Sequence, residues 1–211
     1  TLFNDSIVID YMSSFMKIIT LLGSFFVLII SSSYLKIFKI FKIEYPILIL
    51  SSVLGMMVMI SSNDLMVFYM GLELQSLALY VLATFNRDQL KSSEAGLKYF
   101  VLSALSSGLL LYGCSLIYGF SGSTNFDTIA NQLNSNEYVL TFGIVFILVG
   151  LAFKISAVPF HMWAPDVYEG SPTTVTLFFT MVPKIAALTV FIRFLYVPFL
   201  NLIDQWQMIL I

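Results

Sequence analysis

Residues 138–172 read YVLTFGIVFILVGLAFKISAVPFHMWAPDVYEGSP. The first part, 138–157, carries no charge before Lys154, and it has the roughly 20 residues that an α-helix needs to cross a hydrocarbon layer of about 30 Å. Several prolines then interrupt the chain. Because proline cannot donate a backbone hydrogen bond, Pro159 predicts a break in this helix beside Lys154.

Apolar segments of similar length recur along the rest of the chain. They lie at about 13–34, 46–62, 64–85, 93–119 and 173–198, and a further one begins near Trp206. Lipid offers no partner for backbone groups, and the alternating ten-residue pattern of a barrel is missing, so these segments are expected to be helices. We therefore predict an all-α, polytopic transmembrane bundle of about six to seven spans, with a second broken helix near Pro183.

The composition supports the same fold class. Of 211 residues, 59% are hydrophobic and 10% are charged, whereas soluble domains carry about a quarter charged residues. No polar segment is long enough to fold separately, so residues 1–211 are expected to form a single membrane domain that binds no nucleic acid. One cysteine, Cys114, and one histidine, His161, exclude a disulfide framework and a Cys/His metal tetrad, and no metal site is expected.

Basic residues gather in two of the predicted loops. They are Lys36, Lys39 and Lys42 after the first span, and Arg87 and Lys91 after the third. Because lysine and arginine concentrate on the cytoplasmic or matrix side, both loops are expected to face that side. The polar loop 120–137 and the N-terminus then face the other side.

The loop 120–137 is rich in serine, asparagine and glycine but also contains apolar residues at helical spacing. We predict a short helix on the membrane surface there, and Thr124 and Asp127 resemble a capping box at its start.

Among the ionisable side chains inside the predicted spans, four are candidates for function. They are Glu73, Lys98, Lys154 and Lys184. Such a group costs roughly 2.5–3.5 kcal/mol at the centre of a span, so it needs a partner, water or a function. Glu94 precedes Lys98 by four residues, which is the spacing of an intrahelical ion pair. For all four, a static ion pair and a role in a proton relay both remain open.

Two of these lysines, Lys154 and Lys184, lie beside prolines, Pro159 and Pro183. Each proline leaves one backbone carbonyl without its helical donor, and such carbonyls at membrane depth are tolerated next to water or protein. Both lysines are therefore expected beside a hydrated interior. There, moving one charge changes the protonation of its neighbour, which is the physical basis of a proton relay.

The segment after the break holds further polar residues. His161 has an ordinary pKa near neutrality that suits proton shuttling, but it could equally cap a broken helix. Asp166 and Glu169 could be ligands or loop acids. Because Gly170 and Pro172 lie beside them, we favour loop acids that shape a turn.

These motifs resemble the proton-translocating, antiporter-like membrane subunits of respiratory complex I, and within them the subunit 2 (N-type) branch. The resemblance rests on FKISAVPFHMWAPDVYEGSPTTV (153–175), VPKIAA (182–187), GLELQSLALYVLATF (71–85) and EAGLKYFVLSALSSGLLLYG (94–113). It extends from about residue 45 to residue 196.

The resemblance implies a fold of two inverted five-helix repeats, each with a broken helix, and a line of charged residues through the membrane centre. The proton-relay residues it implies are Glu73, Lys98, Lys154, Lys184 and His161. The chain holds about one repeat plus a preceding span. A second chain, or a segment missing from this one, is therefore expected to supply the second repeat.

The function that the resemblance implies is proton translocation by a membrane-arm subunit of NADH:quinone oxidoreductase. Its setting would be the mitochondrial inner membrane or the bacterial plasma membrane, among lipids and other membrane-arm subunits. The chain has no GxGxxG after a strand and no cysteine cluster, so it is expected to be a non-redox subunit that binds no cofactor. NADH, FMN, iron–sulfur clusters and quinone would be used elsewhere in the complex.

Two alternative functions remain open at this point. The first is a subunit of a multi-subunit sodium/proton antiporter, which would use the same lysines. The second is a structural bundle of spans without transport activity.

Overall fold

The computed structural model describes residues 2–38, 40, 42–132 and 137–210, and this part of the chain is predominantly helical. The helices are α1 (Tyr11–Ile37), α2 (Glu44–Ile60), α3 (Leu65–Ala83), α4 (Leu90–Ser121), α5 (Phe126–Gln132), α6 (Glu137–Ile155), α7 (Trp163–Gly170), α8 (Thr173–Tyr196) and α9 (Ile203–Leu210), with a 3₁₀ turn at Leu200–Leu202. The prediction of an all-α chain is confirmed.

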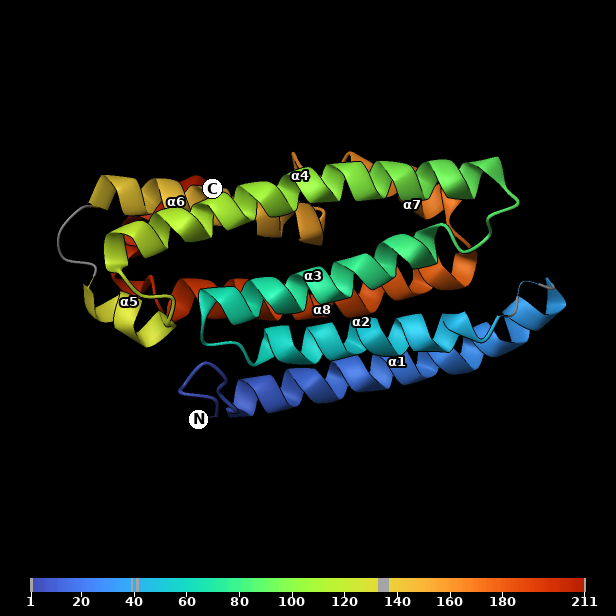
Figure 1. Cartoon of the computed structure of the whole chain (residues 1–211), viewed down its shortest axis with the longest axis horizontal. Coiled ribbons are helices and arrows are strands. Elements are labelled where there is room, and N and C mark those ends of the chain that lie inside the picture. The colour runs from blue at the N-terminus through green and yellow to red at the C-terminus, as the bar shows by residue number, and fades with distance from the viewer. Residues whose placement is uncertain (1, 39, 41, 133–136, 211) are drawn as a thin grey trace.

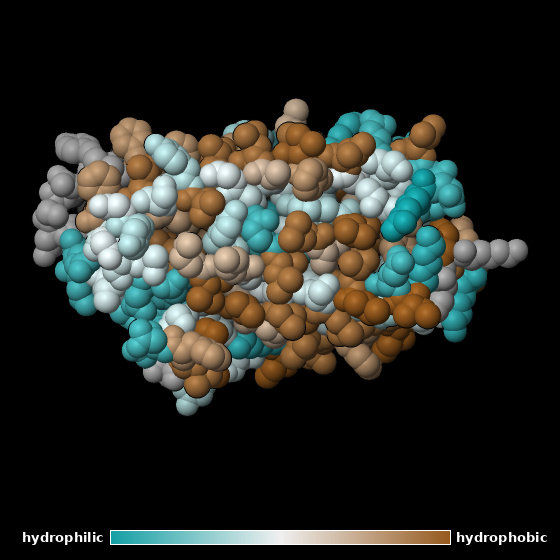
Figure 2. Space-filling model, in the orientation of Figure 1, coloured by the Kyte–Doolittle hydropathy of each residue, from teal (hydrophilic) through white to brown (hydrophobic). Residues whose placement is uncertain are grey.

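In the described part of the chain, six apolar helices form the bundle. Four of them, α1, α3, α4 and α8, are long and apolar enough to cross a membrane, and α2 and the 140–155 part of α6 are shorter apolar helices. Large apolar side chains such as Phe25 and Phe26 point outward, each more than half exposed. Figure 2 shows a broad hydrophobic middle with hydrophilic residues gathered toward both ends. At the position of the predicted seventh span the structure has α9, a helix of eight residues.

The helices lie nearly parallel to the long axis (Figure 1). The most extensive contacts join α2 to α3 and α4 to α6, while α8 packs against α1, α2, α3 and α6. Consecutive long helices alternate in direction, so the α1–α2 and α3–α4 loops lie at one end of the bundle, and α5 lies at the other (Figure 1). The predicted grouping of the two basic loops is confirmed, although Lys39 lies outside the described residues.

Aspartates begin two of the long helices. The Asp10 carboxylate accepts a hydrogen bond from the Ser13 N–H, and the Ser13 hydroxyl accepts one from the Asp10 N–H, which forms a capping box at α1. At α3 the Asp64 carboxylate accepts from the N–H groups of Met66 and Val67. Both caps satisfy backbone donors that have no partner within the helix.

The predicted break beside Pro159 is present between α6 and α7. Ser156 adopts the left-handed conformation at φ 64°, its N–H donates to the carbonyl of Phe153, and the Ala157 N–H donates to the carbonyl of Ala152. This pair of bonds is a Schellman ending. In Figure 1, α6 and α7 both lie along α4, so together they form one discontinuous span.

The second predicted break, near Pro183, is wrong. α8 continues through this proline from Thr173 to Tyr196. Proline at this position removes a single hydrogen bond, the one to the carbonyl of Phe179, and apolar helices tolerate that loss where neighbouring helices hold both sides. Pro183 is buried, and contacts with five other helices, α1, α2, α3, α6 and α7, hold α8 along its length.

The predicted surface helix in loop 120–137 is α5, although residues 133–136 lie outside the described part. Its predicted capping box at Thr124 is wrong, because the Asn125 side chain accepts from the N–H groups of Asp127 and Thr128 instead. The Thr124 hydroxyl donates to Asp64 at the start of α3. A tertiary contact thus uses the hydroxyl that local capping would need.

Candidate functional site: a lysine at a broken helix

Lys154 lies on the last turn of α6, directly before the break. Its Nζ donates to the Ser103 Oγ on α4 at 2.6 Å and to the Ser76 Oγ on α3 at 2.8 Å, and it stands 5.8 Å from the centre of the Tyr80 ring. Both serines are buried. The amine is therefore held among three helices rather than pointing to lipid, and the prediction that Lys154 adjoins a break is confirmed.

The hydroxyl groups around this amine form a chain. The Tyr80 hydroxyl donates to the Ser103 Oγ at 2.7 Å, and the Ser76 hydroxyl donates to the carbonyl of Leu72 at 2.7 Å. Ser76 therefore uses its hydrogen within α3 and offers Lys154 only a lone pair. Ser103 accepts from two donors at once.

Glu73 lies on α3, three residues before Ser76. Its carboxylate interacts electrostatically with Lys154 and with the hydroxyl-bearing rings of Tyr69 and Tyr80. The Oε1 atom is buried, and within the described residues it has no hydrogen-bond partner. Glu73 is therefore the acidic group that acts electrostatically on this lysine in the described structure.

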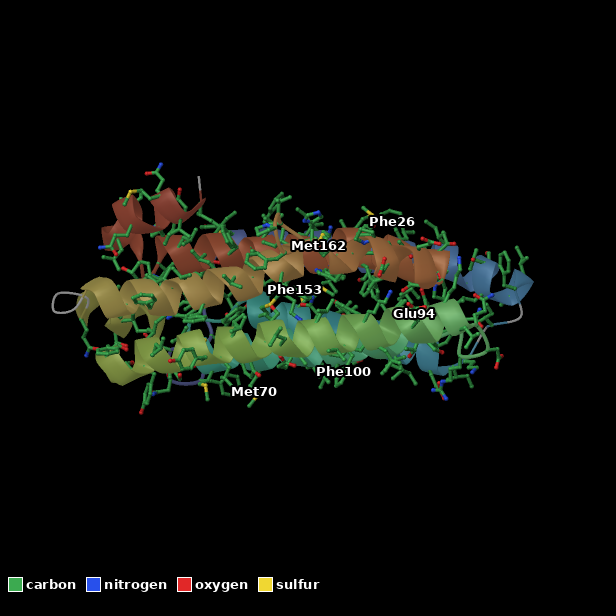
Figure 3. The ribbon with its side chains drawn as sticks, turned by 90° about the horizontal axis from the view of Figure 1, so that it is seen from above. Phe26, Met70, Glu94, Phe100, Phe153 and Met162 are labelled. Atoms are coloured by element: carbon green, nitrogen blue, oxygen red, sulfur yellow. The ribbon has the colours of Figure 1, made fainter. Side chains whose placement is uncertain are left out.

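Aromatic rings pack around the start of α7, on the other side of the break from Lys154. Trp163, the first residue of α7, stacks on Tyr99 of α4 with ring centres 4.8 Å apart and on Phe153 of α6 with centres 5.3 Å apart. Its indole N–H also donates to the carbonyl of Phe153 at 3.0 Å. In Figure 3, Phe153 and Met162, which flank the break, lie near the middle of the bundle's length. These contacts fix the two half-helices relative to α4.

Lys184 is held differently. Its Nζ lies 5.4 Å from the centre of the Tyr168 ring on α7, a cation–π arrangement. Tyr168 in turn packs edge-on against Trp163 at 5.9 Å, and its hydroxyl is buried without a hydrogen-bond partner among the described residues. Aromatic contacts thus connect Lys184 to the break. Within the described residues, Lys184 makes no direct contact with Lys154.

His161 lies inside the break, between α6 and α7. Its carbonyl accepts from the Ala164 N–H at the start of α7 at 3.0 Å. Its ring Nδ1 is buried and has no hydrogen-bond partner in the parts of the chain that are described. The backbone of His161 therefore supports the start of α7, and its ring remains open to a further partner.

Lys98 lies in a separate cluster of charges near the start of α4. It pairs with Glu94 at 2.8 Å, as predicted, and with Asp166 of α7 at 2.7 Å. Lys91 pairs with Glu169 at 3.1 Å. In Figure 3, Glu94 lies toward the end of the bundle at which α4 begins.

The prediction that Asp166 and Glu169 are loop acids shaping a turn is therefore wrong. Both lie on α7, whose helical spacing places them on the side that faces α4, where lysines neutralise them. The cluster lines an open groove of about 150 Å³.

The structure thus brings Ser76 and Ser103 onto Lys154, with Glu73 acting on it electrostatically and without an ion pair among the described residues, and it leaves Lys98 in a cluster of its own. Sequence reasoning missed Ser76, Tyr80 and Ser103. Their signal was weak but present, since all three are hydroxyl-bearing residues inside apolar spans.

A family model described as NADH:quinone oxidoreductase/Mrp antiporter, TM, matches residues 62–211. A curated relative from Pelagibacter ubique, named NADH-quinone oxidoreductase subunit N, is 82% identical over 211 residues, which are 100% of this chain and 45% of the relative. The chain spans about half the length of the curated relatives it matches.

Solved structures agree with this grouping. Respiratory complex I from Thermus thermophilus with bound aureothin contains a chain that is 33% identical, with a TM-score of 0.78, over 92% of this chain and 42% of that one. The Mrp complex from Dietzia sp. DQ12-45-1b contains a chain that is 25% identical, with a TM-score of 0.81, over 92% of this chain and 36% of that one. The chain therefore belongs to the NADH:quinone oxidoreductase/Mrp antiporter transmembrane family.

Proposed function

We propose that this chain is the proton-translocating part of an N-type membrane subunit of NADH:quinone oxidoreductase. The observation that carries the proposal is the Lys154 amine, held by Ser76 and Ser103 beside a helix break and attracted by the Glu73 carboxylate. A lysine amine can gain and lose a proton, and a nearby carboxylate controls which form is favoured.

Redox chemistry would belong to other subunits of the complex, which would use NADH, FMN, iron–sulfur clusters and quinone. The one cysteine and one histidine of this chain cannot supply the ligands of an iron–sulfur cluster. Under this proposal the chain contacts other membrane-arm subunits and lipid. A segment or second chain beyond residues 1–211 supplies the second repeat.

The test replaces Lys154 in the assembled complex and measures NADH-driven proton uptake into inverted membrane vesicles. Lys154→Ala is expected to lower proton flux about a hundredfold, the effect of losing a positioned proton carrier. Lys154→Arg is also expected to lose proton flux, because a guanidinium is effectively never deprotonated in proteins. Lys91→Ala is the matched control, since that lysine lies in an exposed ion pair, and it should pump normally.

Complex assembly should remain intact in all three variants, which is checked on native gels. If the Lys154→Ala complex assembles and pumps at the parent's rate and proton-to-electron ratio, the proposal is wrong.

A second candidate is a subunit of a sodium/proton antiporter of the multi-subunit type. The fold similarity to a chain of the Mrp complex favours it. Higher identity to a complex I chain and to subunit N relatives favours the first candidate. The same vesicles separate the two, because an antiporter exchanges sodium for protons when NADH is absent.

A further inference from the structure

The hydroxyl groups around Lys154 are not equivalent. Ser76 gives its hydrogen to the Leu72 carbonyl, so toward Lys154 it can act only as an acceptor. Ser103 accepts from both Lys154 and Tyr80, and within the described residues no acceptor is recorded for its own hydrogen. A hydroxyl has one donor and two acceptor lone pairs, so both lone pairs of Ser103 are in use.

This difference matters when Lys154 loses its proton. An ammonium group offers three donors and no acceptor, whereas a neutral amine gains a lone pair that needs a donor. An unpaired polar group in a buried site is costly. The Ser103 hydrogen is the one that can turn toward the amine while the Tyr80 hydroxyl continues to donate to Ser103. This turn changes hydrogen bonds and breaks no covalent bond.

Resting on the proposed function, we propose that Ser103, oriented by Tyr80, is a positioning residue that pairs with Lys154 in both protonation states. Ser76 pairs with the ammonium form alone. Because Tyr80 occupies one lone pair of Ser103, the Ser103 hydrogen is kept away from Tyr80 and can turn toward the lysine once the amine is neutral. Both serines are fully buried, at 0% and 1% exposure, so water does not replace them readily.

The proposal predicts different effects for two chemically identical substitutions. Ser103→Ala removes the partner of both states, so proton flux is expected to fall about tenfold at every pH. Ser76→Ala removes an acceptor of the ammonium only, so the pH profile of pumping should move to lower pH with its maximum retained. Glu73 and Tyr80, both on α3, are the ionisable groups that interact with Lys154 in the described structure, and both variants leave them in place.

Three further variants complete the series, measured as NADH-driven proton uptake by the assembled complex in inverted vesicles. Ser103→Cys keeps a weak donor and acceptor of similar size, and its flux should fall between those of parent and Ser103→Ala. Tyr80→Phe keeps the ring but removes the orienting hydroxyl, and about a threefold loss is expected. The matched control is Ser106→Ala, one turn along α4. Ser106 donates to the Gly150 carbonyl rather than to the Lys154 site, so this variant should pump like the parent.

The outcomes separate this inference from the proposed function. If Lys154→Ala stops pumping but Ser103→Ala shows the parent's rate and pH profile, the inference is wrong and the proposed function stands. The same holds if Ser103→Ala produces only the shift expected of Ser76→Ala. If Lys154→Ala pumps normally, both fail. Should Ser103→Ala not assemble, Tyr80→Phe decides, because full pumping without that hydroxyl overturns the orienting role.

Discussion

Asp10 has two roles at the start of α1. It caps the helix, and its two carboxylate oxygens accept from Nη2 of Arg193 on α8 at 2.8 and 2.7 Å. The Arg193 side chain is only 4% exposed, so its charge depends on this partner. Losing one member of a buried ion pair is costly because the other charge remains buried. The pair therefore ties the last turn of α8 to the first turn of α1.

The charge of Asp10 should stabilise the fold in a pH-dependent manner. Burial alone would raise the pKa of the Asp10 carboxyl, but hydrogen bonds from Ser13 and the Arg193 charge hold it below its ordinary value. A lowered folded-state pKa contributes stability that is complete above the unfolded value, about 3.9, and is lost as pH falls through the folded value. Asp10→Asn should therefore lower the free energy of unfolding at pH 7 by about 1–2 kcal/mol after allowing for solvent exposure, which thermal unfolding in detergent measures.

The difference between parent and Asp10→Asn is expected to shrink as pH falls below about 4. Asp64→Asn is the matched control, since Asp64 caps α3 without an ion-pair partner in the described residues and asparagine caps helices as well as aspartate does. Equal destabilisation by the two variants at pH 7 would contradict a stabilising role of the Arg193 ion pair.

At the scale of elements, α2 and α3 approach closely through two glycines. A Cβ atom added at Gly71 would lie 2.8 Å from the backbone nitrogen of Met59, and one added at Gly55 would lie 2.6 Å from that of Gln75. Backbone atoms cannot move aside as side-chain tips can. Small residues allow helices in membranes to pack at such distances.

Gly71→Ala is expected to destabilise the bundle by about 1–3 kcal/mol, the usual cost of overpacking. Gly108→Ala is the matched control, because a Cβ added there meets nothing within 4 Å and alanine favours a helix over glycine by about 0.5–1 kcal/mol. Thermal unfolding in detergent measures both. A Gly71→Ala variant as stable as Gly108→Ala would contradict the close packing of α2 on α3.

Hydropathy and proline chemistry predict much of this fold, but not its hydroxyl contacts. The break at Pro159 follows from the sequence, whereas Pro183 lies in a continuous helix because neighbouring helices hold it on both sides. Lys154 stands out in sequence because charge is costly in a span. Its partners Ser76 and Ser103 do not, since serine is common where helices pack closely, and they lie 78 and 51 residues away.

At the scale of the whole molecule, basic residues gather at one end of the bundle. The end with the α1–α2 and α3–α4 loops carries Lys36, Lys42, Arg87 and Lys91. At the other end Arg193 is neutralised by Asp10. Because basic residues collect on the cytoplasmic side, the first end should face the cytoplasm in a bacterial membrane.

Cysteine labelling of intact cells and inverted vesicles tests this orientation. Asp88→Cys places a thiol on the exposed α3–α4 loop, and Gln132→Cys places one on the exposed end of α5, at opposite ends of the bundle. A membrane-impermeant maleimide should label Asp88→Cys only in inverted vesicles. It should label Gln132→Cys only in intact cells whose outer membrane has been made permeable. The parent serves as the control, because Cys114 is 3% exposed and should remain unlabelled. Labelling of both positions from the same side would contradict the helix arrangement, and the reverse pattern would contradict the orientation drawn from the basic loops.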